Sequence, residues 1–246
     1  MRWARLLIIA MVLLLCSGSV VQAEEQSADQ LVNEGIALGL EEKYLDAIKL
    51  FDKALILDPD NYKALYNKGT AFNYLGLFQD GLETLNQALE IEPGNTSALN
   101  NKAFALSELG KHNEAYDIYS HILEVEPRNT QIWNNQGLEL ARLGRYEEAI
   151  ESFDSGLEID STVIDLWNNK GTALNFQGRD EEAIIVFDNG LKIDPDNTDV
   201  LTNKGVSLYT LGRYEEALEC YDRVLEIDPD YADSIKYREM ALNKIQ

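Results

Sequence analysis

The sequence predicts an all-α solenoid, an array of short helix pairs stacked in one direction. Three observations support this prediction. The same residue types return every 34 residues without an insertion, large apolar residues recur at helical spacing within each repeat, and glycine or proline follows each apolar stretch where a helix has to end. The composition, 45% hydrophobic and 26% charged over 246 residues, is typical of a soluble helical body rather than of disorder.

Six copies of the 34-residue unit fix the frame of the array. Position 8 of each copy is glycine or alanine, position 20 is alanine or glycine, and position 32 is proline in all copies but one. A repeat array buries apolar area between neighbouring units, so one large central core is not required. The copies are residues 28–61, 62–95, 96–129, 130–163, 164–197 and 198–231.

The first half of each unit predicts one helix. In the last copy Leu201, Gly205 and Leu208 occupy positions 4, 8 and 11, a spacing that places them on one helix face. Position 15 is a glycine in five copies, and glycine tolerates the left-handed residue that closes a helix. These glycines are Gly76, Gly110, Gly144, Gly178 and Gly212.

The second half of each unit predicts a second, antiparallel helix. It carries the small residue of position 20, an aromatic residue or leucine at position 24 and leucine at position 28 in every copy. The small residues at positions 8 and 20 allow the two helices to approach closely, whereas overpacking such a site typically costs about 1–3 kcal/mol. Proline at position 32 ends the helix, and a following asparagine such as Asn61 or Asn95 can cap the next one.

Residues 232–246 predict one further helix that caps the end of the stack. Ile235, Leu242 and Ile245 continue the apolar stripe of a first helix, while Glu239 stands where the small residue would be. A half unit with one apolar face is expected to cover the open end of a solenoid.

Residues 1–23 have the composition of a signal peptide. Arg2 and Arg5 precede an apolar run of ten residues, and cleavage is expected after Ala23. Ten helical residues cover about half of a bilayer core. Two alternatives remain: an uncleaved anchor through residues 6–21, and lipidation at Cys16.

Export is therefore expected, with the chain secreted or in the cell envelope, or anchored to the membrane with its repeats outside. Residues 24–27 form a linker to the array. Once the leader is cleaved, Cys220 is the one cysteine left, so no internal disulfide is expected, and a small semi-buried residue is the expected role of Cys220.

The charge balance is strongly acidic. The formal net charge of −22 becomes −24 when Arg2 and Arg5 leave with the leader, which contains no acidic residue. A body of this charge is repelled by nucleic acids and by anionic membrane surfaces, so neither is an expected partner, and membrane contact is expected only through an uncleaved N-terminal segment.

The repeat pattern resembles the tetratricopeptide repeat (TPR) family. The match covers 204 of 246 residues and includes bulky residues at positions 4 and 11, small residues at 8 and 20, an aromatic residue at 24 and proline at 32. Three local departures are Gly81 for alanine, Ser161 for proline and Asp180 for tyrosine. The resemblance implies a right-handed α-solenoid whose first helices line a concave groove.

One column is not explained by packing within a pair. Position 6 is asparagine in every copy and lies about 200° around the first helix from position 4. An amide offers donors and an acceptor, which suits the backbone of an extended peptide. In relatives with a long superhelix such ladders hold peptide backbone. The alternative is that these residues belong to the family consensus and bond water or a neighbouring turn. The column is Asn33, Asn67, Asn101, Asn135, Asn169 and Asn203.

Neighbouring groove positions are rich in amides and aromatic rings. Position 5 adds Tyr66, Asn100, Asn134 and Asn168. Some TPR co-chaperones grip a terminal carboxylate with paired basic residues, but here only Lys63 and Arg142 lie on that face, too far apart for one clamp. Lysines at position 7 are expected to pack their stems and to extend their amines into solvent.

The sequence offers no catalytic motif and no metal-binding pattern. His112 and His121 are expected to lie on different helices, and the Asp-Pro-Asp turns lack the other residues of a calcium loop. We expect no enzyme, no cofactor and no small-molecule substrate. Asn95 begins a glycosylation sequon in an exported chain.

These features together predict an exported TPR scaffold that binds a protein or peptide in its groove and helps to assemble an envelope or extracellular complex. A structural or self-associating protein anchored in the membrane, and a regulatory subunit of a separate enzyme, are the alternatives.

Overall fold

The computed structural model describes residues 26–246. The predictions of a signal peptide at 1–23, of an uncleaved anchor and of lipidation at Cys16 lie outside these residues. Among the helices of the described part, none is both long and apolar enough to cross a membrane.

The described residues form thirteen helices of 13 or 14 residues each, which confirms the prediction of an all-α solenoid. They are α2 (Ala28–Leu40), α3 (Tyr44–Leu57), α4 (Tyr62–Tyr74), α5 (Phe78–Ile91), α6 (Thr96–Glu108), α7 (His112–Val125), α8 (Thr130–Arg142), α9 (Tyr146–Ile159), α10 (Ile164–Phe176), α11 (Asp180–Ile193), α12 (Thr198–Thr210), α13 (Tyr214–Ile227) and α14 (Ala232–Ile245).

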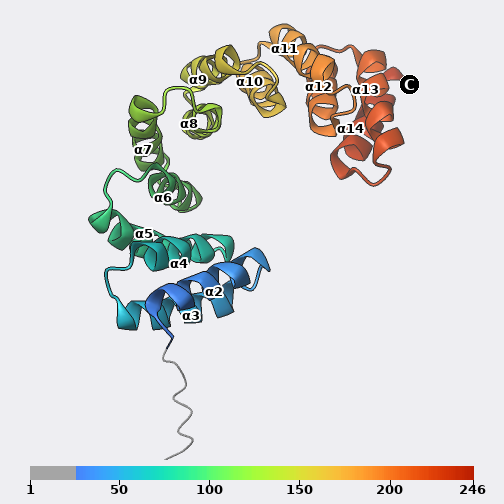
Figure 1. Cartoon of the computed structure of the whole chain (residues 1–246). Coiled ribbons are helices and arrows are strands. Elements are labelled where there is room, and N and C mark those ends of the chain that lie inside the picture. The colour runs from blue at the N-terminus through green and yellow to red at the C-terminus, as the bar shows by residue number, and fades with distance from the viewer. Residues whose placement is uncertain (1–25) are drawn as a thin grey trace, which may run out of the picture.

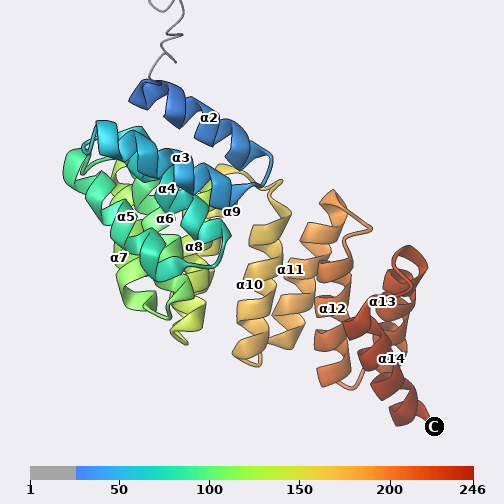
Figure 2. The same cartoon turned by 90° about the horizontal axis from the view of Figure 1, so that it is seen from below.

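The helices stack in series, each packing on the one before and the one after it. Figure 1 shows the array as an open arc with the even-numbered helices α4 to α12 on the inner side and the odd-numbered helices on the outer side. Figure 2 shows α10, α11 and α12 lying side by side, with their axes roughly aligned. The first helix of each unit therefore faces the inside of the arc.

The ends of the helices are set by the residues that the repeat places there. Asn61, Asn95, Asn129 and Asn197 each accept a hydrogen bond from the backbone N–H three residues on, as N-caps do. The five glycines of position 15 have φ between 72° and 77°. In the first unit Glu42 takes this place with φ 60°, the one non-glycine residue of positive φ in the described part.

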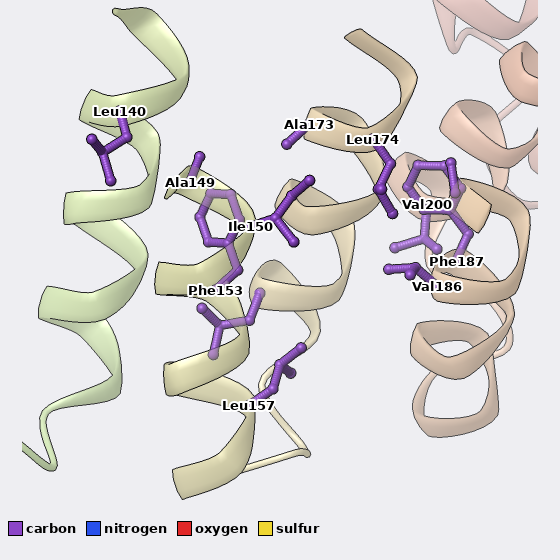
Figure 3. Packing of buried hydrophobic residues seen from close by; sticks show 12 residues of the cluster. Leu140, Ala149, Ile150, Phe153, Leu157, Ala173, Leu174, Val186, Phe187 and Val200 are labelled. Carbon is purple, nitrogen blue, oxygen red and sulfur yellow. The ribbon is translucent and has the colours of Figure 1, made fainter. Parts of the chain in front are cut away.

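Each unit is closed by an aromatic or leucine side chain that lies over the small residue of position 8. Phe153 is fully buried, and a Cβ atom added to Gly137 would lie 2.8 Å from its Cδ1 atom. The buried side chains of α8 to α11 form one continuous cluster, in which Phe153 and Phe187 take equivalent places in successive units (Figure 3). The missing side chain at position 8 is therefore what admits the ring.

Three of the four lysines at position 7 are tied to the preceding unit, which corrects for these three the expectation that their amines extend into solvent. The Nζ atoms of Lys68 and Lys204 each lie 2.6 Å from an aspartate oxygen, on Asp52 and Asp188 respectively. Lys170 makes the equivalent contact with Asp154. The lysine side chains are only 19–23% exposed, because position 7 faces the second helix of the unit before. These contacts link successive units.

Helix α14 does cover α13, but its buried face differs from the predicted one. Ser234 and Ala241 are buried, and Ser234 forms a hydrogen bond with Thr202. Ile235 and Ile245, predicted to pack, are 39% and 44% exposed. In complete units the position of Ile235 packs on the second helix of the same unit, as Trp167 does beside Gly190, and no second helix follows α14 in the described residues. Leucine at the position of Ile245 is exposed in two complete units as well, 36% at Leu109 and 38% at Leu211. The end of the stack therefore keeps an apolar face.

Candidate functional site

The inner face of the arc contains a hollow of about 490 Å³ that spans three successive first helices, α4, α6 and α8. The structure thus brings together Asn100, Asn101 and Asn135, three of the residues predicted from the sequence. The complete lining is Thr70, Asn73, Tyr74, Asn100, Asn101, Phe104, Gln131 and Asn135.

The predicted asparagines of positions 5 and 6 pair with each other across the unit boundary. Nδ2 of the position 6 residue donates to Oδ1 of the position 5 residue 35 places earlier. The distance is 2.8 Å from Asn169 to Asn134 and 2.9 Å from Asn203 to Asn168. The bond from Asn135 to Asn100 is longer, 3.4 Å. We call these three pairs the amide ladder.

Toward the N-terminus, the position 6 asparagines that precede the amide ladder have other hydrogen-bond partners. Asn101 donates to Thr70 Oγ1 at 2.8 Å, and Thr70 in turn donates to the carbonyl of Tyr66. Asn67 bonds its own helix at the carbonyl of Lys63, and Tyr66 stacks on Tyr62. Asn33, in the first unit, is exposed. In the predicted position 6 column, only Asn135, Asn169 and Asn203 therefore belong to the amide ladder. Their partners are the position 5 residues Asn100, Asn134 and Asn168.

Each amide pair leaves hydrogen-bonding capacity on the inner face. In the hydrogen bonds among residues 26–246, Oδ1 of the position 6 residues and Nδ2 of the position 5 residues have no protein partner. A pair such as Asn134 and Asn169 therefore offers one acceptor and one donor, the two groups that a peptide bond requires. The side chains are half-buried and are held in place by their mutual bond.

Sequence reasoning missed a buried carboxylate at the boundary between the third and fourth units. Glu139 is 2% exposed and accepts hydrogen bonds at 2.7 Å from both Ser107 Oγ and Arg142 Nη1. Its other oxygen lies 2.9 Å from His112 Nδ1. Burial, and to a smaller extent the charge of Glu139, raises the pKa of Tyr119. Arg142 is thus already paired and is not a free half of a carboxylate clamp.

A signal for this cluster was present in the sequence. Position 10 is alanine or serine in the other five copies, and only in the fourth is it a glutamate. A charged residue in a column of small buried residues requires a buried partner. Ser107 supplies one from position 12 of the preceding unit.

Asn95 and Cys220, the other residues considered from the sequence, each have a structural role in the helix array. Asn95 caps α6, and its Nδ2 donates to Glu92 Oε2 at 3.1 Å; its glycosylation stays a prediction. Cys220 is buried, which raises the pKa of its thiol to about 11. His112 and His121, predicted to lie on different helices, both lie on α7, because the helix already begins at His112. Within residues 26–246 no group of three His, Cys, Asp or Glu side chains is placed to hold a metal ion.

Comparison with known families and structures agrees with this architecture. Models of the tetratricopeptide repeat match residues 33–96, 74–136, 130–163, 164–197 and 198–231. The last three ranges begin and end where the sequence columns place units four to six. No curated protein matches the chain.

Three solved structures illustrate the likeness of fold. A tetratricopeptide repeat protein from Parabacteroides merdae superposes with a TM-score of 0.78 at 21% identity, over 88% of this chain and 86% of that one. YrrB, described as a TPR protein with an unusual peptide-binding site, gives 0.59 at 21% identity over 77% and 97%. MamA from Desulfovibrio magneticus gives 0.66 at 16% identity over 71% and 99%.

The helix pairs, the column of small residues under each ring and the family matches from residue 33 to residue 231 lead to one conclusion. The chain belongs to the tetratricopeptide repeat family.

Proposed function

We propose that this chain is an exported, non-catalytic scaffold that binds an extended segment of another protein along its inner face. It helps in this way to assemble a complex in the cell envelope or outside the cell. TPR proteins bind protein or peptide partners, and the fold is typical of interaction scaffolds rather than of enzymes. Export rests on the signal-like composition of residues 1–23.

The amide ladder is the observation that supports this function best. It presents pre-oriented donors and acceptors in a row along one curved face, and such a row recognises backbone rather than a particular side chain. Because each pair is fixed by its own hydrogen bond, little side-chain entropy is lost when a peptide binds. The net charge favours a basic partner over an acidic one.

Replacing Asn101, Asn135 and Asn169 together by alanine is expected to reduce capture of the partner at least tenfold. The change removes the position 6 member of two ladder pairs, Asn135 and Asn169, together with the amide of Asn101, and leaves the shape of the groove intact. The measurement is a pull-down with the full chain from native membrane and secreted fractions, followed by quantitative mass spectrometry. Recovery of the same proteins in the same amounts by the triple variant would exclude the ladder as the binding element.

The control has to allow for lost stability, because the three asparagines also link successive units. Each such hydrogen bond contributes about 0.5–1.5 kcal/mol. A matched variant replaces Lys68, Lys170 and Lys204 by alanine, which removes three contacts between units that face the second helices instead. This variant is expected to capture the partner like the wild type even where its melting temperature falls.

A further inference from the structure

Two pockets on the inner face correspond residue for residue although they are three units apart. The N-terminal pocket, about 320 Å³, lies between the first and second units and is lined by Gly39, Tyr44, Phe51, Asn67, Thr70 and Tyr74, among others. The central pocket, about 260 Å³, lies between the fourth and fifth units and is lined at the same positions by Ala141, Tyr146, Phe153, Asn169, Thr172 and Phe176.

Position 12 differs between these two unit boundaries and the other three. In the two pockets it is Gly39 or Ala141, neither of which can form a side-chain hydrogen bond across the boundary. At the other three boundaries between complete units it is a polar residue that bonds the next first helix. Asn73 donates to the carbonyl of Asn101, Ser107 donates to Glu139, and Asn175 accepts from Ser207. The two pockets thus lie at the two boundaries where position 12 forms no such bond, whereas the larger hollow lined by Asn73 lies across the boundaries that follow the second and third units.

Both pockets have an aromatic wall that water reaches. Tyr74 stacks on Tyr44 with ring centroids 5.0 Å apart, and Phe176 stacks on Tyr146 at 5.2 Å. The outer rings remain 68% and 66% exposed. Phe51 and Phe153 lie beneath the two pockets but are only 1% and 0% exposed, so an entering side chain contacts the exposed aromatic wall rather than these rings.

We propose that the two pockets hold two apolar side chains of one extended basic segment, whose backbone runs over the amide-lined hollow between them. This rests on the proposed function and adds a side-chain preference and a register to it. An extended segment suits the arrangement because the amide-lined hollow at Asn101 lies between the two pockets.

The geometry gives the spacing of the two anchors. Successive first helices also contact each other, so the usual separation of about 10 Å between packed helices places pockets three units apart at about 30 Å. At about 3.1 Å for each residue of an extended polyproline II segment, about nine residues connect the two anchors, and because this conformation has three residues per turn both anchor side chains point to the same side.

Charge gives the polarity of the flanking residues. Glu42 lies at the N-terminal pocket, is exposed and takes part in no ion pair among the described residues. A basic residue next to the first anchor would meet this carboxylate. The excess of 43 acidic over 21 basic residues in the whole chain acts in the same direction at longer range.

The test uses fluorescein-labelled peptides made of glycine, serine and lysine with two phenylalanines six, nine or twelve residues apart, and matched peptides with one phenylalanine. Fluorescence anisotropy against the full chain is expected to give the tightest binding at nine, about tenfold or more tighter than with one anchor. Equal affinity at all spacings, no gain from the second phenylalanine, or no binding of any peptide would overturn the proposal.

Filling either pocket is the matching change in the protein. A Cβ atom at Gly39 meets nothing within 4 Å, so Gly39→Leu can extend into the N-terminal pocket from an unobstructed Cβ, and leucine also favours a helix more than glycine does. Gly39→Leu and Ala141→Leu are each expected to reduce the affinity of the two-anchor peptide to that of the one-anchor peptide. Ala37→Leu, an exposed site on the same helix outside the pocket, is the control and is expected to change nothing.

The two proposals fail in different ways. If the filled pockets weaken binding but the Asn101, Asn135 and Asn169 triple variant binds like the wild type, the pockets stand and the ladder does not. If the triple variant weakens every peptide and neither Gly39→Leu nor Ala141→Leu has an effect, the ladder stands and the two-pocket register is wrong.

Discussion

Phe153→Ala is expected to lower the free energy of unfolding by about 3–5 kcal/mol, the range found when a large buried side chain leaves a cavity. Phe153 is fully buried, between Gly137 beneath its ring and the continuous cluster of α8 to α11. The glycine cannot fill the space that the ring leaves. The loss falls in the middle of the array, where it weakens the unit that joins the two halves.

Denaturation in guanidinium chloride, followed by circular dichroism at 222 nm, measures the effect. Ile185→Ala is the matched control, because Ile185 is 63% exposed on α11 and its removal is expected to cost less than about 0.5 kcal/mol. Since a repeat array unfolds through its weakest boundary, the Phe153→Ala transition is also expected to broaden or split. Equal losses in the two variants would show that the ring does not hold the unit together.

Gly81→Ala is expected to destabilise the protein by about 1–3 kcal/mol, although alanine is the usual residue at position 20. A Cβ atom at Gly81 would overlap Asn73 Oδ1 and would lie 3.2 Å from the carbonyl oxygen of Gly69. Asn73 cannot easily move away, because its Nδ2 bonds the carbonyl of Asn101 in the next unit at 2.9 Å. Glycine therefore stands at position 81 in place of the usual alanine because Asn73 occupies the space that an alanine Cβ atom would need.

A double-mutant cycle tests this pairing. In an Asn73→Ala background the overlap is gone, so Gly81→Ala should become neutral or stabilising by up to about 1 kcal/mol through its helix preference. Asn73 Oδ1 is buried without a hydrogen-bond partner in the described structure, so removing the asparagine breaks no hydrogen bond at this oxygen. Urea denaturation of the four proteins gives the coupling. Additive effects would contradict a direct contact between the two sites.

The repeat columns predict most of the fold because each helix end repeats a local signal. Asn61 caps a helix, Gly76 closes one and Leu85 or Phe153 fills the space over a position 8 glycine, all within one unit or its nearest turn. These contacts lie within about 34 residues and depend on helix geometry alone. The solenoid was therefore predictable from one chain.

The contacts between units were less predictable because they depend on the rotation of one unit against the next. That rotation pairs Asn169 with Asn134 rather than leaving it free, and Lys170 with Asp154 rather than with water. Both columns are visible in the sequence, but their register is not. Ile235 on α14 was expected to be buried but is 39% exposed. Its burial depends on a second helix of the same unit, and none follows α14 in the described residues.

The claim that the inner face binds an extended protein segment is tested most directly by site-specific photo-crosslinking in the native host. Benzoylphenylalanine replaces Phe104, 43% exposed in the inner hollow, or Ile185, 63% exposed on an outer helix. Benzoylphenylalanine at position 104 is expected to form a covalent adduct with the partner that the unsubstituted chain captures, and at position 185 it is expected to form none. An adduct from position 185 with none from position 104 would contradict the claim.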